Sequence, residues 1–78
     1  MEIKELSKYS KNNKNDIEKS KMCACYFCLK TFEPKQIIDW IDNKNTALCP
    51  ECGIDSVVAD SVVDLDMDFL KKASDYWF

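Results

Sequence analysis

The sequence contains no histidine and no arginine, only one glycine and two prolines, and no long apolar run. Without histidine it lacks the side chain that most often carries out acid–base catalysis near neutral pH, and no nucleophile–base pair stands out. We therefore expect that the protein is not an enzyme. Without arginine it lacks the forked side chain that most often reads base edges in nucleic acids.

The apolar stretches are also too short to cross a bilayer. The first 21 residues are polar, so they do not form an apolar leader that would direct the chain to an oxidising compartment. We expect a soluble, cytoplasmic protein with no membrane partner.

The most informative residues are four cysteines in two C-x2-C pairs. Cys25 and Cys28 form the first pair, Cys49 and Cys52 the second, and twenty residues lie between the pairs. This spacing is typical of four-cysteine zinc sites. Each pair places two thiolates on one tight turn, and two facing turns supply a tetrahedron of soft sulfur ligands. Four thiolates fill the coordination shell, so the pattern predicts one structural Zn²⁺ and no catalytic metal.

The residues around the second pair fit such a turn closely. Pro50 pre-sets the backbone at the start of the turn. Gly53, the only glycine, follows the second cysteine, where a positive φ is often required and glycine adopts it without steric cost. Leu29 occupies the corresponding position of the first turn, where glycine would be easier. The second turn is therefore the stronger signal.

Two alternatives to this zinc site remain open. A fifth cysteine, Cys23, lies two residues before Cys25 and could replace it as a ligand, although we favour a small residue on a strand. Iron is the alternative metal, because tetrahedral four-sulfur sites also hold iron for electron transfer. Disulfides fit less well, since five cysteines leave one unpaired.

A chain of 78 residues forms one domain at most and usually needs a metal or disulfides for stability. Residues 1–21 contain few apolar side chains, and we expect a mostly disordered polar leader. Residues 22–78 predict a small metal-stabilised α+β domain, a rubredoxin-like zinc ribbon built from short antiparallel strands and the two CxxC turns. The expected elements are strands on both sides of the first turn within 23–32, a helical turn over 35–38, a hairpin turn at 42–45 between strands, and a strand at 56–59.

The end of the chain predicts a helix over about 66–77. Asp66 can cap its N-terminus, and Leu70, Ala73 and Trp77 share one face. We expect Trp77 to lie in the core and to pack on Trp40. The densest large apolar group in the chain is Ile37, Ile38, Trp40 and Ile41.

The string C-x2-C-x3-F-x-P, followed by IxxWID, TAxCPxCGIDSVV and FLKKxxxYWF, extends over about residues 23–78. It resembles a family of small bacterial cytoplasmic proteins of unassigned function, and more generally zinc-ribbon and rubredoxin-like domains. The resemblance implies a rubredoxin-like zinc ribbon with a C-terminal helix, and no activity comes with it. Leu29 and the short insert depart from rubredoxins, which argues against electron transfer.

The charge distribution points to a protein partner. Residues 22–78 carry ten acids against five lysines, while residues 1–21 carry six lysines against four acids. An acidic folded part favours a basic partner protein, as for a small inhibitor or immunity-type protein. The lysine-bearing leader leaves a nucleic-acid-associated role as the alternative, and a homodimer burying the aromatic C-terminus is also open. The candidate partner surface comprises Asp60, Asp64, Asp66, Asp68, Tyr76 and Phe78.

Overall fold

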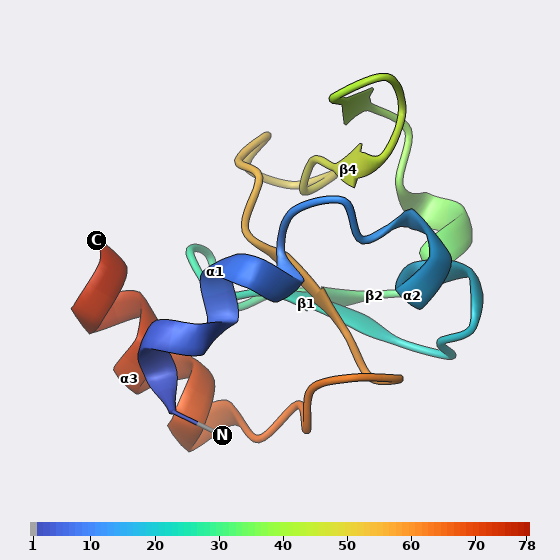
Figure 1. Ribbon diagram of the computed structural model, residues 1–78. Helices are drawn as coiled ribbons and strands as arrows, with labels where there is room; N and C mark the ends of the chain where they lie inside the picture. Colours follow the sequence, from blue (N-terminus) through green and yellow to red (C-terminus); the bar gives the residue numbers. More distant parts are fainter. Residues whose placement is uncertain (1) are drawn as a thin grey trace.

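The computed structural model describes residues 2–78 and has an α+β architecture of short antiparallel strands and helices with a longer C-terminal helix (Figure 1). The elements follow in the order η1 (Ile3–Glu5), α1 (Leu6–Tyr9), α2 (Lys14–Glu18), β1 (Cys23–Cys25), β2 (Thr31–Phe32), η2 (Pro34–Gln36), β3 (Trp40–Ile41), β4 (Thr46–Ala47), β5 (Val57–Ala59) and α3 (Met67–Trp77). Among residues 2–78, none of the helices has the length and apolar character that crossing a bilayer requires.

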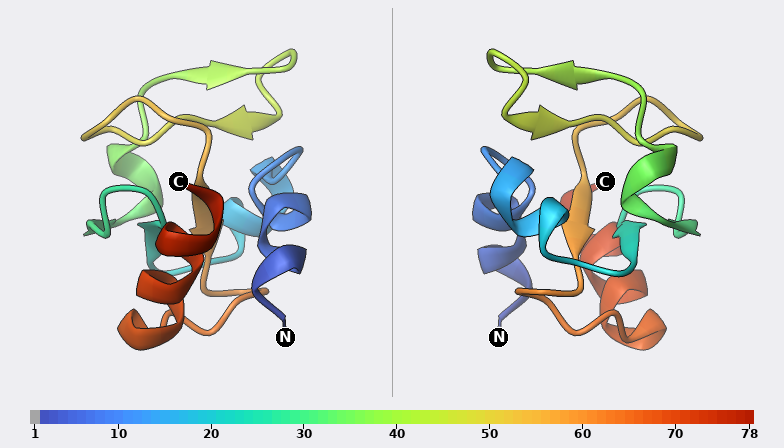
Figure 2. Two further views of the ribbon diagram at one scale, coloured as in Figure 1. Left: turned by 90° about the vertical axis from the view of Figure 1, so that its left-hand side faces the viewer. Right: turned by 90° about the vertical axis from the view of Figure 1, so that its right-hand side faces the viewer.

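The strands form two separate sheets. β1 is the central strand of a three-stranded sheet in the order β2–β1–β5, and it pairs antiparallel with both neighbours. β3 and β4 pair with each other in a hairpin. This hairpin lies at one end of the molecule and α3 at the other, with the three-stranded sheet between them (Figures 1 and 2). The strands expected on both sides of the first cysteine turn, the hairpin and the strand before Asp60 are therefore confirmed.

The two longer strands of the three-stranded sheet, β1 and β5, are buried on both faces, whereas Thr31 of the edge strand β2 is exposed. Alternate residues of a strand point to opposite faces, and β1 shows this directly. Cys23 and Cys25 pack into a cluster on the side of the two cysteine turns, which we call the metal-side cluster, while Ala24 packs on the side of α1 and α3. Val57 and Val58 of β5 divide between the two clusters in the same way. Small and β-branched residues fill β1 and β5 because both faces of these two strands are covered.

The turn that closes the hairpin needs unusual backbone conformations. Asp42, Asn43 and Lys44 have φ values of 55°, 58° and 67°, in the left-handed region. Asp and Asn tolerate this region better than most residues. The Thr46 hydroxyl donates to the Asp42 carboxylate at 2.9 Å and ties the turn to the start of β4. The polar turn expected at 42–45 thus has a specific geometric reason.

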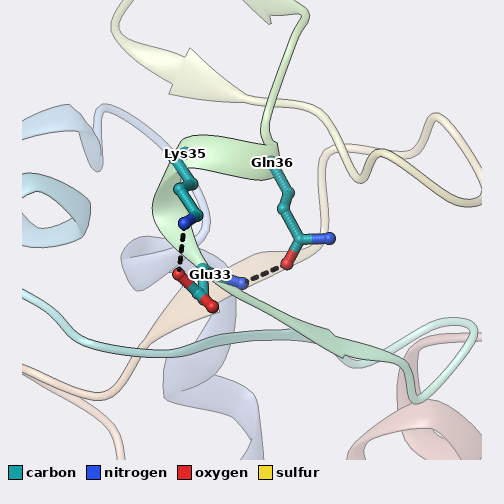
Figure 3. Close-up of polar contacts among 3 residues, drawn as sticks. All are labelled: Glu33, Lys35 and Gln36. Carbon is teal, nitrogen blue, oxygen red and sulfur yellow. Dashed lines mark hydrogen bonds and ion pairs between the residues drawn. The ribbon is translucent and has the colours of Figure 1, made fainter.

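A short 3₁₀ turn, η2, begins at Pro34, as expected from its fixed φ. Figure 3 shows how its first turn is closed. The Glu33 backbone N–H donates to the Gln36 side-chain oxygen at 2.8 Å, and the Glu33 carboxylate pairs with Lys35 at 3.3 Å. The ion pair is exposed and adds little stability. The turn delivers Ile37 to the metal-side cluster.

The structure differs from the expected mobile leader. The N-terminal segment, residues 2–21, forms η1, α1 and α2 and packs against the rest of the chain. Leu6 is buried in the cluster beneath α3, and Ile17 is buried in the cluster beside the cysteines. The expectation weighed average polarity, whereas in the structure two apolar side chains and one buried amide, Asn13, attach this segment.

The predicted C-terminal helix is present, and Asp66 caps it by accepting a hydrogen bond from the Asp68 backbone N–H at 3.0 Å. Leu70 and Ala73 are buried, as expected from their spacing. Trp77 is not a core residue packed on Trp40. Its indole N–H donates to the Ile3 carbonyl at 3.2 Å, so it joins α3 to η1 near the surface.

The apolar group at 37–41 is only partly buried. Ile37 belongs to the core and Trp40 packs against it, but Ile38 is 77 % exposed and Ile41 is also exposed. Strand alternation explains the difference between Trp40 and Ile41, because a two-residue strand at the end of the molecule can bury only one of its faces, whereas Ile38 lies before β3 in the connection from η2.

Candidate metal centre

The two cysteine turns have the same backbone geometry. In the first, the Leu29 N–H donates to the Cys25 carbonyl at 2.9 Å; in the second, the Gly53 N–H donates to the Cys49 carbonyl at 2.9 Å. Leu29 and Gly53 both have positive φ, 63° and 78° respectively. The first turn therefore adopts the same left-handed conformation with leucine that the second adopts with glycine. No atom lies within 4 Å of a Cβ placed on Gly53, so conformation and not space selects glycine there.

Backbone N–H groups point at the first cysteine of each turn. Phe27 N–H lies 3.4 Å from the Cys25 sulfur, and Glu51 N–H lies 3.4 Å from the Cys49 sulfur. Such donors stabilise a thiolate, because hydrogen bonds to a charged acceptor are stronger than neutral ones. In the second turn Pro50 lies between Cys49 and Glu51, where it shapes the backbone and leaves the Glu51 N–H free to donate.

The four sulfur atoms converge on one point. The ligand atoms of Cys25, Cys28, Cys49 and Cys52 all lie within 4.8 Å of one another. Sulfur pairs across the two turns are 3.6 Å apart for Cys25 and Cys52 and 3.7 Å for Cys28 and Cys49. A tetrahedral ion with sulfur at ~2.3 Å needs sulfur–sulfur separations of ~3.8 Å. The residues therefore fit a single tetrahedral ion of the size of zinc or iron.

Burial and close packing disfavour the ionised form of these thiols. Burial raises the pKa of Cys28 and of Cys52, and the neighbouring thiols raise them further. At Cys49 burial also opposes ionisation, but the backbone N–H groups of Cys52 and Glu51, together with the thiols of Cys52 and Cys28, outweigh it and lower the pKa of that thiol. Four thiolates packed this closely repel one another, and a bound divalent ion removes that repulsion.

The fifth cysteine lies outside the group of four. Cys23 is buried on β1, and its sulfur lies 3.5 Å from the Ser20 hydroxyl. Burial raises the pKa of this thiol, which keeps it protonated. Within residues 2–78, Cys25 and not Cys23 completes the cluster, so Cys23 behaves as the small strand residue expected from the sequence.

The acidic residues of the candidate partner surface have different surroundings. The Asp60 carboxylate accepts hydrogen bonds from the backbone N–H groups of Lys21 and Met22, at 3.0 and 3.1 Å, and so fixes the start of β1. Asp66 is the cap of α3. Asp64 and Asp68 are exposed, and Asp64 and Asp66 line a small hollow. Two of the four acids thus have a structural task.

The two aromatic residues of that surface lie on different sides of α3. Phe78 is 57 % exposed and stacks edge-on against Phe27 of the first cysteine turn, with 4.6 Å between ring centroids. Tyr76 is 60 % exposed and lines a groove between α3 and η1, beside Ile3 and Lys72. Both remain accessible to a partner, and Phe78 also joins the helix to the metal site.

Sequence reasoning missed two residues that support the site. Asn13 is buried and hydrogen-bonded to strands on either side of the metal-side cluster, and Ser56 contacts a cysteine sulfur. Asn13 lies in a run of polar residues that gives no sign of burial. The position of Ser56, four residues after Cys52, was the only available signal for its role.

Comparison of the chain with protein-family models, with curated proteins and with solved structures gave no significant match in any of the three. The resemblance to a bacterial family thus has no support from these comparisons, and no solved structure supports a rubredoxin-like relationship. The protein is a small α+β protein with a zinc-ribbon-like cluster of four cysteines, and that class rests on the geometry of its two turns and four sulfurs.

Proposed function

We propose that this chain is a non-enzymatic binding module, held together by one structural Zn²⁺ and recognising a basic protein partner. The observation that carries the proposal is the closed group of four sulfur atoms, all within 4.8 Å of one another. Four protein ligands leave no coordination position for water or substrate, which favours a structural ion over a catalytic one. The absence of histidine supports the same view.

A structural ion also suits the limited core of this chain. The three-stranded sheet has strands of only two or three residues. Zinc binding to small four-ligand domains contributes on the order of 10–16 kcal/mol, which is comparable to or larger than the net stability of an ordinary domain. The ion would join the turn after β1 to the turn before β5, segments that the sheet alone connects weakly.

Native mass spectrometry and thermal unfolding test the metal. We expect one zinc ion per chain and loss of the cooperative transition when a strong chelator removes it. Cys52→Ser should abolish stoichiometric binding, whereas the matched control Cys23→Ser should retain one ion, since Cys23 lies outside the cluster. A metal-free protein that unfolds cooperatively at an unchanged temperature would refute the proposal. A coloured protein containing iron would favour the alternative metal.

The partner proposal rests on charge and on exposed aromatic rings. The net charge is −3, and four thiolates with one divalent ion add about two negative charges. Asp64, Asp68, Tyr76 and Phe78 are exposed, and aromatic residues are enriched where interfaces concentrate their binding energy. An acidic surface attracts a basic partner and speeds its association. The inhibition of a basic effector by a small acidic protein is the setting in which such a module would act.

Affinity capture followed by mass spectrometry tests the proposed basic protein partner. We expect a basic protein that is retained by the wild type at low salt, is released as ionic strength rises, and is lost with Tyr76→Ser or Phe78→Ser. Asn15→Ser is the control, because Asn15 is exposed on α2, away from α3. Capture that is insensitive to salt, or a bound nucleic acid that survives both aromatic substitutions, would count against a protein partner.

A further inference from the structure

Ser56 lies where the chain leaves the second cysteine turn and enters β5. Its backbone carbonyl accepts a hydrogen bond from the Tyr26 N–H at 3.0 Å, and Tyr26 directly follows Cys25. Its side-chain oxygen lies 2.9 Å from the Cys25 sulfur. Ser56 is 1 % exposed. Both its backbone and its side chain thus join the segment after the second turn to the first turn.

When a metal is bound, the Ser56 hydroxyl can only donate, and not accept, the hydrogen bond to the Cys25 sulfur. A metal-bound cysteine is a thiolate, which has no proton to donate. The Ser56 hydroxyl must then be the donor, and it makes no other hydrogen bond among the residues that the structure describes. Its burial keeps solvent from competing for this proton.

The resulting site is asymmetric. Cys25 is fully buried and faces two donors, the Phe27 N–H and the Ser56 hydroxyl. Cys28 and Cys52, in contrast, are half-buried and reach the surface. Hydrogen bonds to a thiolate withdraw charge from sulfur and make it a poorer nucleophile, while exposure gives reagents access.

We propose that Ser56 is a positioning residue that makes Cys25 the anchoring ligand of the metal, and that Cys28 and Cys52 form the edge through which the metal is exchanged. This inference rests on the proposed metal site. Removing the Ser56 hydroxyl should lower the affinity for the metal while leaving all four cysteine ligands in place. Loss of an outer hydrogen bond typically reduces metal affinity about 10- to 100-fold.

The rate of zinc transfer to a colorimetric chelator tests the role of the Ser56 hydroxyl. We compare the wild type with Ser56→Ala, Ser56→Thr and Ser10→Ala. Ser10 is the matched control, because it is equally buried and its hydroxyl bonds to the Ser7 carbonyl and lies 3.2 Å from the Tyr26 hydroxyl, but contacts no cysteine. We expect transfer at least about tenfold faster for Ser56→Ala, near-normal transfer for Ser56→Thr, which keeps a hydroxyl, and no change for Ser10→Ala.

Cobalt substitution adds a readout that a general loss of stability would not alter. The sulfur-to-cobalt charge-transfer band should shift to lower energy in Ser56→Ala, because a thiolate without its hydrogen bond is a better electron donor, and should keep its position in Ser10→Ala. Should Ser56→Ala fail to fold, the wild type alone still tests the inference by limited alkylation of the zinc-loaded protein. Peptide mapping should then show Cys28 and Cys52 modified before Cys25.

The outcomes separate this inference from the proposed metal site. A wild type that binds neither zinc nor cobalt refutes both. A wild type that binds them, with Ser56→Ala and Ser10→Ala alike in transfer rate and spectrum, refutes the role of Ser56 alone. Alkylation of Cys25 before Cys28 and Cys52 refutes the proposed exchange edge.

Discussion

Asn13 offers the sharpest test of how the N-terminal segment is held. Its side chain is 1 % exposed and bonds to three backbone groups. The amide nitrogen donates to the Val57 carbonyl at 2.9 Å and to the Tyr9 carbonyl at 3.3 Å, and the amide oxygen accepts from the Ala47 N–H at 3.2 Å. One residue therefore connects the N-terminal segment with β4 and β5.

Asn13→Ala removes these bonds and leaves two buried backbone groups, the Ala47 N–H and the Val57 carbonyl, without their partner. Each such group costs about 1–3 kcal/mol when it stays dry. We therefore expect a loss of about 3 kcal/mol, a large fraction of the net stability of a small domain. For a chain of this length that loss lowers the melting temperature by on the order of 10–20 °C.

Urea unfolding of the zinc-loaded protein, followed by circular dichroism, measures the effect. Asn15→Ala serves as the matched control, because Asn15 is exposed on α2 and alanine is a better helix former, so stability should hold or rise slightly. If Asn13→Ala changes stability by no more than Asn15→Ala, the N-terminal segment is not attached in solution. The polar, mobile leader suggested by the sequence would then be the correct description.

Three further predictions follow from the cysteine turns and the C-terminal helix. Gly53→Ala should cost about 1 kcal/mol by thermal unfolding, because φ is 78° and alanine is strained there; Gly53→Asn should cost less, and equal stability of all three proteins would contradict the argument. Zinc affinity should rise with pH, because Cys28 and Cys52 have raised pKa values and the ion must displace their protons. The folding stability of the metal-free protein should change in the opposite direction. It should fall above about pH 9, where the thiols of the unfolded chain ionise more readily than these two. Metal titrations across about pH 6–9 check the first sign, and a pH-independent affinity would contradict it. Unfolding of the chelator-treated protein between about pH 8 and pH 11 checks the second sign, and unchanged stability over that range would contradict it. Asp66→Ala should cost about 1 kcal/mol through loss of the helix cap, whereas Asp64→Ala, on an acid outside the helix, should be nearly neutral by the same assay.

Much of the fold was predictable where local chemistry decides it. The spacing of the cysteines predicted that the four thiols converge, and Gly53 and Pro50 predicted the shape of the second turn. Asp66 marked the start of α3 because capping depends on residues next to one another in the chain. The hairpin turn at 42–45 followed from residues that tolerate left-handed conformations.

The remaining features depend on partners distant in the sequence. Asn13 is buried because Ala47 and Val57 need hydrogen bonds, and nothing near Asn13 in the chain signals that need. Ile38 is exposed in the connection between η2 and the hairpin, where no other part of the described chain covers it, although its sequence neighbourhood is the most apolar in the chain. Average polarity and local apolar density are poor guides in a protein this small, where single side chains decide burial.

The attachment of the N-terminal segment also sets an order of events during synthesis. Asn13 leaves the ribosome 34 residues before Ala47 and 44 residues before Val57, the groups it binds. Both cysteine turns are therefore complete before the last of these partners emerges. The proposed ion can therefore bind before Val57 reaches Asn13, so that the N-terminal segment completes its attachment to β5 only after the two cysteine turns are joined.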